Sequence, residues 1–300
     1  MMELLQVDNN TYYIKNKTNI GIYKVDSNSV YIIDSGIDKD SGKKILKIIT
    51  EKGWKIKGII NTHSNADHIG GNRVIQERTG CNIYSYNIEK CITENPILEP
   101  SILYGGYPFK DLKNKFLYAS KSQVKDIEKL DEQGIEYIKL PGHFFDMIGI
   151  KTSDNIYFLA DSLFSHEVIE KYHVFFIYDV KSYLETLDYL ETLDGKLYVL
   201  SHVDACSNIK DLIKINRDKV NEIIEVIYSY LTEEKTFEDI LQYVFNKYNL
   251  VMNTNQYVLI GSTIKSYLSY LFDSGKIIYG FVNNKMIWKQ NMNNNEEHIK

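Results

Sequence analysis

Hydrophobic and polar positions in the first part of the chain follow the pattern of short β-strands. The segments TYYIK, IGIYKV and SVYIIDS are rich in β-branched and aromatic residues, with Asn, Ser or Asp between them. Residues 41–52 change to helical spacing, with Ile45 and Ile49 on one face and Gly53 at the end. The segment IKGIINTH, residues 56–63, has the pattern of a buried strand. We therefore expect an antiparallel meander followed by a helix and a buried strand.

The next part of the chain alternates between helical and strand patterns. Helical spacing predicts helices over 69–79, 122–133 and 180–193, while residues 87–120 contain three of the four prolines and are expected to be irregular. The segments IEYIKLP, DMIGIKT, IYFLAD and KLYVLSH have strand patterns. The alternation predicts a layered α/β architecture.

The pattern changes after about residue 207. Three helices are expected, over 209–231, 236–249 and 256–273, and the middle one opens with TFED, in which Thr236 and Asp239 form a variant capping box. The segments KIIYGFV and KMIWKQ flank two asparagines and predict a hairpin. Helices followed by a hairpin resemble a winged helix. We therefore expect a first domain over 1–207, a helical winged-helix-like domain over 208–290 and a mobile tail over 291–300.

Composition and charge narrow the class of protein. With 44% hydrophobic and 25% charged residues, the 300-residue chain is expected to fold into two domains. The net charge of −5 argues against a polyanion as the main partner, although a local basic face is compatible with that average. Three cysteines favour a reducing compartment. Because we find neither a signal peptide nor an apolar run of roughly 20 residues, we expect a cytoplasmic protein without a membrane partner.

The segment NTHSNADHIGGN, residues 61–72, carries the most specific chemistry. It places His63, Asn65, Asp67 and His68 between a predicted strand and a predicted helix. Strand ends are where α/β sheets bring side chains from distant parts of the chain together. Three more donors lie at such ends: His143 in LPGHFFD, Asp161 in FLADS and His202 in LSHVD. Imidazole and carboxylate donors without cysteine suit Zn²⁺, with Fe or Mn as substitutes.

The residues THSNADH, PGH, AD and SH, in this order, resemble the metallo-β-lactamase superfamily of metal-dependent hydrolases. The resemblance implies an αββα sandwich with two metal positions in a cleft at one edge. It also implies that His63, residue 65 and His143 hold one metal, and that Asp67, His68 and His202 hold the other. Asp161 would bridge the two.

Asn65 departs from the family pattern, which has a histidine there. A carboxamide oxygen is a neutral and weaker donor than imidazole for a metal such as zinc. His63, His143 and Asp161 would still supply three ligands, the number typical of a catalytic zinc site. The sequence therefore leaves one bound ion and two bound ions equally open.

The sequence favours a hydrolase in which a metal-bound hydroxide attacks a small acyl substrate, namely a thioester, ester or lactone. Asp67 and Asp161 are the candidates to orient the nucleophile and relay its proton. A scarcity of cationic residues in the cleft is expected, which favours acyl substrates. Candidate substrate contacts are Tyr104 and Tyr107 in LYGGYPF, and His173 beyond Asp161.

Two alternatives stay open at this stage. One is a phosphodiesterase or ribonuclease of the same fold. The other is a metal-binding sensor in which Asn65 marks lost catalysis and the C-terminal domain binds nucleic acid or a protein partner. That domain is poor in cations along its third predicted helix, with Lys265 and Lys276 near exposed faces, so we favour a structural, dimerising or cleft-capping role. A homodimer is compatible with this interpretation.

Overall fold

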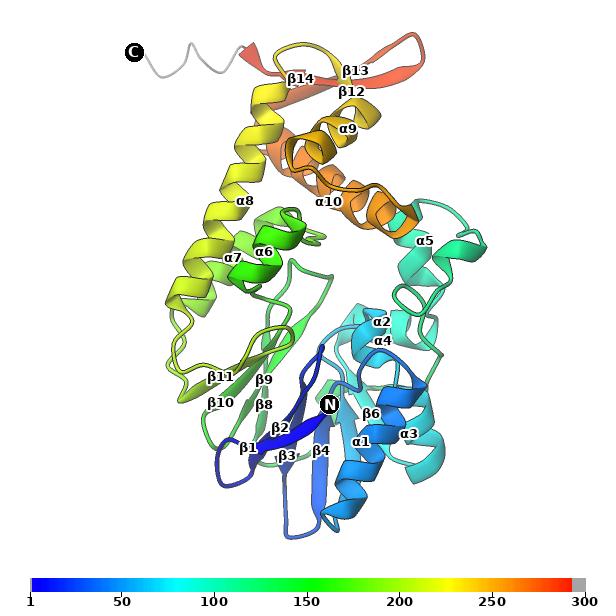
Figure 1. Cartoon of the computed structure of the whole chain (residues 1–300), viewed down its shortest axis with the longest axis vertical. Helices are drawn as coiled ribbons and strands as arrows, with labels where there is room; N and C mark the ends of the chain where they lie inside the picture. The colour runs from blue at the N-terminus through cyan, green and yellow to red at the C-terminus, as the bar shows by residue number, and fades with distance from the viewer. Residues whose placement is uncertain (1, 293–300) are drawn as a thin grey trace.

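Two β-sheets form the centre of the N-terminal part of the molecule, which extends to about residue 207 (Figure 1). The structure is a computed structural model that describes residues 2–292. The larger sheet contains β1 to β7 in chain order: Glu3–Gln6, Thr11–Lys15, Ile20–Lys24, Ser29–Ile33, Lys55–Ile60, Asn82–Ser85 and Lys125–Asp126. Strands β2 to β4 are the expected antiparallel meander, to which β1 adds a further antiparallel strand that was not expected, and β4 to β7 are parallel to one another.

The smaller sheet has the strand order β11-β10-β9-β8. Its strands are β8 (Ile135–Lys139), β9 (Ile148–Thr152), β10 (Ile156–Ala160) and β11 (Leu197–Leu200). Strand β10 pairs antiparallel with β9 and parallel with β11. All five residues of β10 are buried, because helices cover the outer face of this sheet and the larger sheet covers its inner face.

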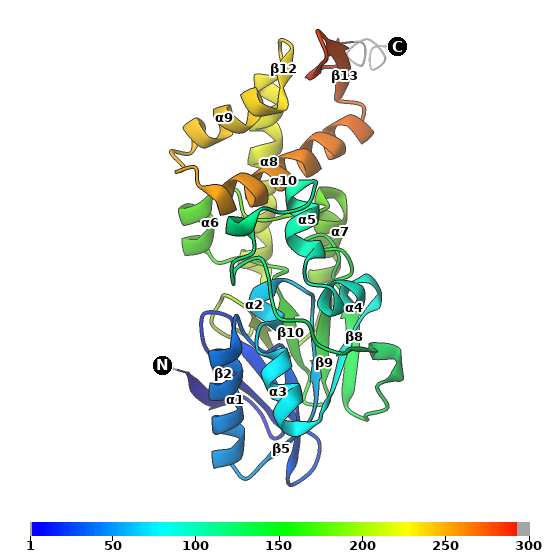
Figure 2. The same ribbon diagram turned by 90° about the vertical axis from the view of Figure 1, so that its right-hand side faces the viewer.

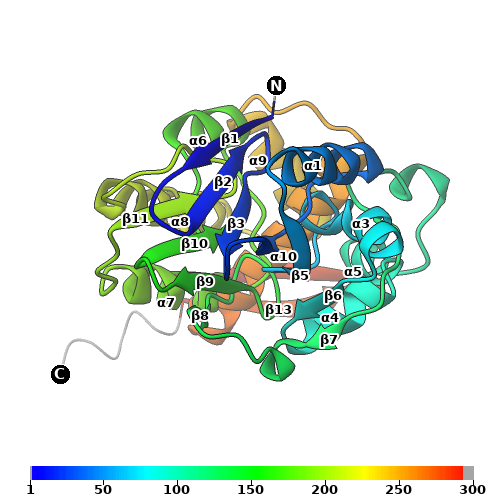
Figure 3. The same cartoon turned by 90° about the horizontal axis from the view of Figure 1, so that it is seen from below.

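Helices lie on the outer face of each sheet, as Figure 3 shows from below. Helices α1 (Lys39–Glu51) and α3 (Asn72–Thr79) cover the larger sheet, where Ile45 and Ile75 pack with strand residues such as Ile32. Helix α7 (Val180–Leu190) covers the smaller sheet. A separate core between the sheets joins residues such as Ile60 and Phe158. The order helix, sheet, sheet, helix agrees with the expected layered architecture.

The C-terminal part stands on the side of the smaller sheet and rises above the sheets (Figures 1 and 2). Its elements are α8 (Lys210–Tyr230), β12 (Lys235–Thr236), α9 (Phe237–Lys247), α10 (Thr254–Asp273), β13 (Ile277–Val282) and β14 (Lys285–Gln290). The three expected helices and the hairpin are confirmed, and so is the capping box of Thr236 and Asp239. The likeness to a winged helix stays a prediction. No helix among residues 2–292 is long and apolar enough to cross a membrane.

One hydrophobic cluster continues across residue 207, where the sequence pattern changes. It joins Tyr183 and Leu187 of α7 with Ile224 of α8 and with Ile264 and Leu271 of α10. The division into domains at 207 therefore stays a prediction, and the two parts share a core. The expected tail over 291–300 lies mostly outside the described residues.

The helix expected over 122–133 is wrong. The segment contains β7 and the short 3-10 helix η2 (Ile127–Lys129), with the Asp126 side chain accepting a hydrogen bond from Glu128 N. Val124 and Ile127 have helical spacing, but Val124 packs with α1 and α3 whereas Ile127 packs between the sheets. Two apolar residues three apart can thus belong to opposite faces of a sheet edge, which periodicity does not distinguish from a helix.

Residues 87–120, expected to be irregular, contain two helices. These are α4 (Asn87–Glu94) and α5 (Leu98–Tyr104), followed by the 3-10 turn η1 (Lys110–Leu112). Pro100 is compatible with α5 because it lies in the first turn, where the backbone N–H has no partner within the helix. The short helices α2 (Ala66–Ile69) and α6 (His166–Tyr172) were also not expected as separate elements.

Asn216, in the middle of α8, ties the C-terminal part to the loop that follows β10. Its side chain is fully buried; Oδ1 accepts hydrogen bonds from Phe164 N (3.0 Å) and Tyr183 Oη (3.1 Å), and Nδ2 donates to Phe164 O (2.8 Å). Phe164 lies three residues after Asp161. One amide group therefore satisfies both backbone groups of a loop residue close to the predicted site.

We expect Asn216→Ala to lower the free energy of unfolding by about 2–4 kcal/mol, because it leaves Phe164 N–H, Phe164 C=O and the Tyr183 hydroxyl buried without a partner. Urea denaturation measures the change. Asn246→Ala, at an exposed position of α9, is the control and is expected to change stability by less than about 0.5 kcal/mol. Equal effects of the two substitutions would contradict this role of Asn216.

Candidate metal centre

The candidate ligands meet at the edge of the two sheets where strands from both end. His63 follows β5, Asp67 and His68 lie in α2, and Asp161 and His202 follow β10 and β11. His143 lies in the connection between β8 and β9. The chain therefore brings all of these side chains to one place from four separate segments, as strand-end placement predicts.

The end of β10 has a local distortion that directs Asp161 into the site. Ala160 has a φ of 51°, and the pairing of β10 with β11 shifts register between Phe158 and Ala160. A positive φ is strained for a residue with a Cβ, and such strain concentrates at functional sites. Asp161, the next residue, is 5% exposed.

Each of the four histidines is oriented by a hydrogen bond from its Nδ1 atom. The partners are Thr62 Oγ1 for His63 (3.0 Å), Asp34 Oδ2 for His68 (2.8 Å), Phe176 O for His143 (3.0 Å) and Lys17 O for His202 (2.7 Å). Carbonyl and carboxylate oxygens only accept, and Thr62 Oγ1 already donates to Asp34 Oδ2 (2.7 Å). Nδ1 therefore carries a hydrogen in each case, and Nε2 is the atom left to bind a metal ion or a second proton, as in metal-binding histidines.

The Nε2 atoms face carboxylate oxygens and not donors. Asp161 Oδ1 lies 3.3 Å from His68 Nε2, while Asp161 Oδ2 lies 3.3 Å from His202 Nε2 and 3.6 Å from His143 Nε2. His63 Nε2, His68 Nε2 and Asp161 Oδ1 are buried without a hydrogen-bond partner. Electron pairs that face one another in a buried site require a shared proton or a metal ion. The donor set therefore fits a metal.

The ligand atoms fall into two overlapping groups. His63, His68 and Asp161 form one, and Asp67, His68 and His202 form the other, with the ligand atoms of each group within 4.8 Å of one another. The resemblance to the family assigned His68 to only one of the two metal positions, whereas here it belongs to both groups. The structure thus supports a metal-binding cluster, while the assignment of each residue to a position stays a prediction.

Burial and neighbouring charges shift the pKa values of the cluster residues. Burial and the neighbouring His68 hold the pKa of His63 well below its usual value, and burial also lowers the pKa of His143. Burial alone would lower the pKa of His202, but Asp161 and Asp67 outweigh it and raise the pKa to about 9. Burial would raise the pKa of Asp161, yet His202 and His68 hold it well below its usual value. The carboxylates therefore attract positive charge to this site.

Sequence analysis missed three buried carboxylates around the cluster. Asp34, after β4, accepts hydrogen bonds from Thr62 N and Thr62 Oγ1 as well as from His68. Glu89 of α4 accepts from Ser64 N and Ser64 Oγ, and burial raises its pKa to about 7. Glu99 of α5 contacts Asn65. Asp34 has the strand-end placement that identified Asp161, whereas no local pattern marks the two glutamates.

A cavity of about 630 Å³ opens beside the cluster, with His143, Asp161 and His202 on its wall. Most of the remaining wall is apolar or aromatic, and it includes Phe164 and Phe176 of the N-terminal part. Helix α10 contributes to the wall with Asn255, Gln256, Leu259 and Ile260. The C-terminal part therefore forms one side of the cleft.

The predicted substrate contacts do not line this cavity. Tyr104 and Tyr107 are 42% and 78% exposed, and Tyr104 packs edge-on against Phe109. His173 stacks on Tyr248 of the C-terminal part. Tyr104 and His173 thus take part in aromatic contacts outside the cavity, and Tyr107 is exposed. Phe116, from the same long connection as the two tyrosines, does line the cavity.

The expected scarcity of cations in the cleft is also corrected. Lys17 and Lys171 line the cavity, together with two acidic residues, Asp161 and Glu167. Lys17 precedes β3 and Lys171 lies on α6, so sequence position gave no indication that the two meet at one opening.

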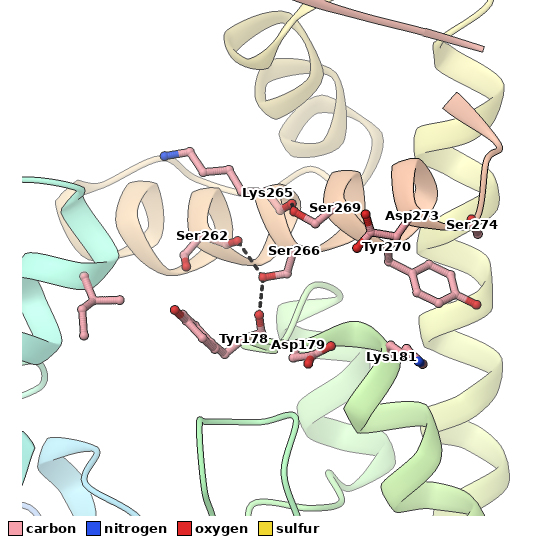
Figure 4. A pocket seen from close by; sticks show the side chains of 11 residues that line it. Tyr178, Asp179, Lys181, Ser262, Lys265, Ser266, Ser269, Tyr270, Asp273 and Ser274 are labelled. Carbon is pink, nitrogen blue, oxygen red and sulfur yellow. Dashed lines mark hydrogen bonds between the residues drawn. The ribbon is translucent and has the colours of Figure 1, made fainter. Parts of the chain in front are cut away.

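A larger groove of about 850 Å³ lies between α10 and the N-terminal end of α7 (Figure 4). Its lining is mainly polar; the figure shows Ser266 hydrogen bonded to the backbone oxygen of Tyr178 (2.6 Å). None of the candidate ligands lines this groove. We therefore place the chemistry in the smaller cavity, in spite of its size.

Comparisons with known proteins identify the family. The model of the metallo-beta-lactamase superfamily matches residues 14–202, more than half of the chain, so the protein belongs to this superfamily. A hydroxyacylglutathione hydrolase of Pelagibacter ubique (strain HTCC1062) is 23% identical over 228 residues, which cover 70% of this chain and 85% of the relative. A second one, from Rhodopseudomonas palustris (strain BisB18), is 27% identical over 150 residues, which cover 50% of this chain and 49% of the relative.

A solved structure shares the fold over nearly the whole chain. It is a beta-lactamase domain protein from Burkholderia ambifaria, with a TM-score of 0.73 and 12% identity, and the match covers 96% of this chain and 94% of that one. The likeness therefore includes the C-terminal helices as well as the two sheets.

We expect His202→Ala to reduce the metal content of the purified protein by about one equivalent, because it removes an Nε2 donor that faces Asp67 and Asp161. Elemental analysis measures the stoichiometry. His166→Ala is the matched control, since His166 is exposed and pairs with Glu170 on α6. Equal metal contents in the two variants would contradict the placement of the centre.

Proposed function

We propose that the chain is a metal-dependent hydrolase of small acyl compounds, with thioesters as the first choice. One observation carries the proposal: four histidine Nε2 atoms and two carboxylates converge beside a largely apolar cavity, and three of these side chains line it. Hydroxyacylglutathione hydrolase, the name of two relatives, denotes a thioester hydrolase and supports this choice.

The ligand assignment follows the family pattern residue by residue. His63, Asn65 and His143 would hold the first metal, and Asp67, His68 and His202 would hold the second, with Asp161 contributing to both positions. Zinc is our choice because the donors are imidazole and carboxylate groups. A bound zinc ion would supply a nucleophile at neutral pH, because zinc lowers the pKa of water to roughly 7.

Asp67 and Asp161 have different surroundings and therefore different roles. Asp161 is enclosed by three histidines, so it orients the centre and keeps its negative charge. The Asp67 side chain is 28% exposed, and its Oδ2 accepts a hydrogen bond from Thr18 Oγ1 (3.0 Å). Asp67 is therefore able to accept a proton from the attacking water and pass it to the leaving group.

The cavity indicates the kind of acyl compound. Its apolar wall fits the hydrocarbon part of an acyl group, and Phe164, Phe176 and Leu259 exclude water from the reacting centre. Lys17 and Lys171 at the opening are exposed, and each is able to attract a carboxylate on the substrate. The substrate that fits both features is a thioester with an apolar acyl group and an anionic end.

The C-terminal part then has a cleft-capping role. Residues of α10 line the cavity, and Asn114 of the long connection donates a hydrogen bond to Asn255 (2.9 Å), which joins the two sides of the opening. A winged-helix-like arrangement of α8, α9, α10 and the β13–β14 hairpin would serve as a scaffold for this wall. No interaction with nucleic acid is needed for this role.

We expect Asp67→Asn to lower kcat for thioester hydrolysis by about 10² to 10⁴-fold, since a carboxamide does not accept the proton of the attacking water. A panel of chromogenic thioesters, esters, lactones and phosphodiesters measures turnover. The control is Asp194→Asn, at an exposed position before β11. Unchanged turnover in the Asp67 variant, or turnover of phosphodiesters alone, would be incompatible with the proposal.

We expect Lys17→Met and Lys171→Met each to raise KM about 2- to 5-fold for a thioester that carries a carboxylate, which corresponds to an exposed charge pair. KM for a neutral thioester of the same length should not change. Lys181→Met, which lies at the groove of Figure 4, is the control. An equal rise in KM for both substrates would show that the lysines do not recognise the negative charge.

A further inference from the structure

Asn65 does not act as its position in the fold would predict. It is the N-cap residue of α2, with an extended backbone (φ −60°, ψ 143°), but its side chain makes no capping hydrogen bond. Asparagine is among the preferred N-cap residues because its side-chain oxygen normally accepts a hydrogen bond from the first turn. Here the amide is 8% exposed and directed to the metal centre instead.

Glu99 determines how the Asn65 amide is turned. Glu99 lies in the first turn of α5 and is 2% exposed, and its Oε1 accepts a hydrogen bond from Asn65 Nδ2 at 2.8 Å. The backbone amide of Ala66 also donates to it. Burial raises the pKa of Glu99 well above its usual value, but in either protonation state a carboxyl oxygen accepts the hydrogen bond from Nδ2, so Glu99 holds Nδ2 on its own side and turns Oδ1 to the opposite side.

On that side Asn65 Oδ1 meets another acceptor. It lies 3.2 Å from His143 Nε2, whose electron pair is free because Nδ1 donates to Phe176 O. Two acceptors at this separation repel unless a cation or a proton lies between them. The hydrogen bonds of Asn65 and His143 thus orient Asn65 Oδ1 and His143 Nε2 toward one point, beside Asp161 and His63. Both atoms are of the kind that binds a metal ion.

We propose that Glu99 is a positioning residue that makes Asn65 a ligand of the first metal position, in place of the histidine of the family pattern. The proposal rests on the metal centre of the proposed function and adds the residue that completes its first position. Glu99 fixes the carboxamide that supplies the missing donor. The first position then has one charged carboxylate, Asp161, whereas the second has two, Asp67 and Asp161. The first position is therefore the weaker of the two.

Calorimetric titration of the metal-free protein with Co²⁺, followed in parallel by visible absorption, separates the two positions without any measurement of activity. We expect two unequal binding steps in the natural protein. Glu99→Ala should weaken the weaker step about 10- to 100-fold, the usual effect of losing a group that orients a ligand, and leave the stronger step unchanged. Glu185→Ala, exposed on α7, should leave both steps unchanged.

A second variant exchanges the two functional groups and remains informative if Glu99→Ala folds poorly. Asn65→Asp alone places two carboxylates against each other and should destabilise the fold. In the double variant Asn65→Asp, Glu99→Gln, the new carboxamide at position 99 donates to the new carboxylate at position 65. The orientation is restored, so we expect the weaker step to return to at least its natural strength.

The outcomes separate this proposal from the proposed function. Two steps that are unaffected by Glu99→Ala, or a folded double variant without the weaker step, would overturn the role of Glu99 alone. A single step in the natural protein would also overturn it. No Co²⁺ binding at all would overturn both the role of Glu99 and the proposed hydrolase.

Discussion

The convergence of four imidazole Nε2 atoms and two carboxylates on one point is the constraint on which the N-terminal part of this structure depends. Four imidazoles are held by acceptors behind them, so their free nitrogens face Asp67 and Asp161 in a site that is mostly closed to water. Such an arrangement is unfavourable by itself, because burial penalises charge and facing acceptors repel. The rest of the fold maintains it: two sheets supply the strand ends, and strained backbone at Asp34 (φ 64°) and Ala160 directs carboxylates inward.

Much of this arrangement could be predicted from the sequence. The strands and helices around the site follow clear periodic patterns, and the seven predicted ligands lie together because each follows or begins an element at the same edge. Short-range chemistry was equally informative in the C-terminal part, where the capping box of Thr236 and Asp239 forms as expected. These features share a physical basis: each depends on residues a few positions apart, or on the general rule that strand ends meet.

The features that could not be predicted depend on contacts between distant segments. Glu89 and Glu99 lie in helices that prolines and aromatic residues obscure, and their roles arise only when α4 and α5 pack against α2. Lys17 and Lys171 become neighbours of the cleft through the placement of α6. Val124 and Ile127 have helical spacing, yet they serve opposite faces of a sheet edge. The spacing of residues along the sequence does not show which distant residue a buried side chain contacts.

The wall contributed by α10 has a consequence for how such proteins diverge. The residues that hold the reacting centre and the residues that shape the opening belong to different stretches of the chain, so substitutions in Gln256 or Leu259 alter the admitted molecules without disturbing the donors. Exchange of the whole segment after residue 207 is more demanding, because one hydrophobic core spans this boundary. Any segment that replaced the part after residue 207 would need an equivalent of Asn216 and an apolar surface that matches α7, because the two parts share one core.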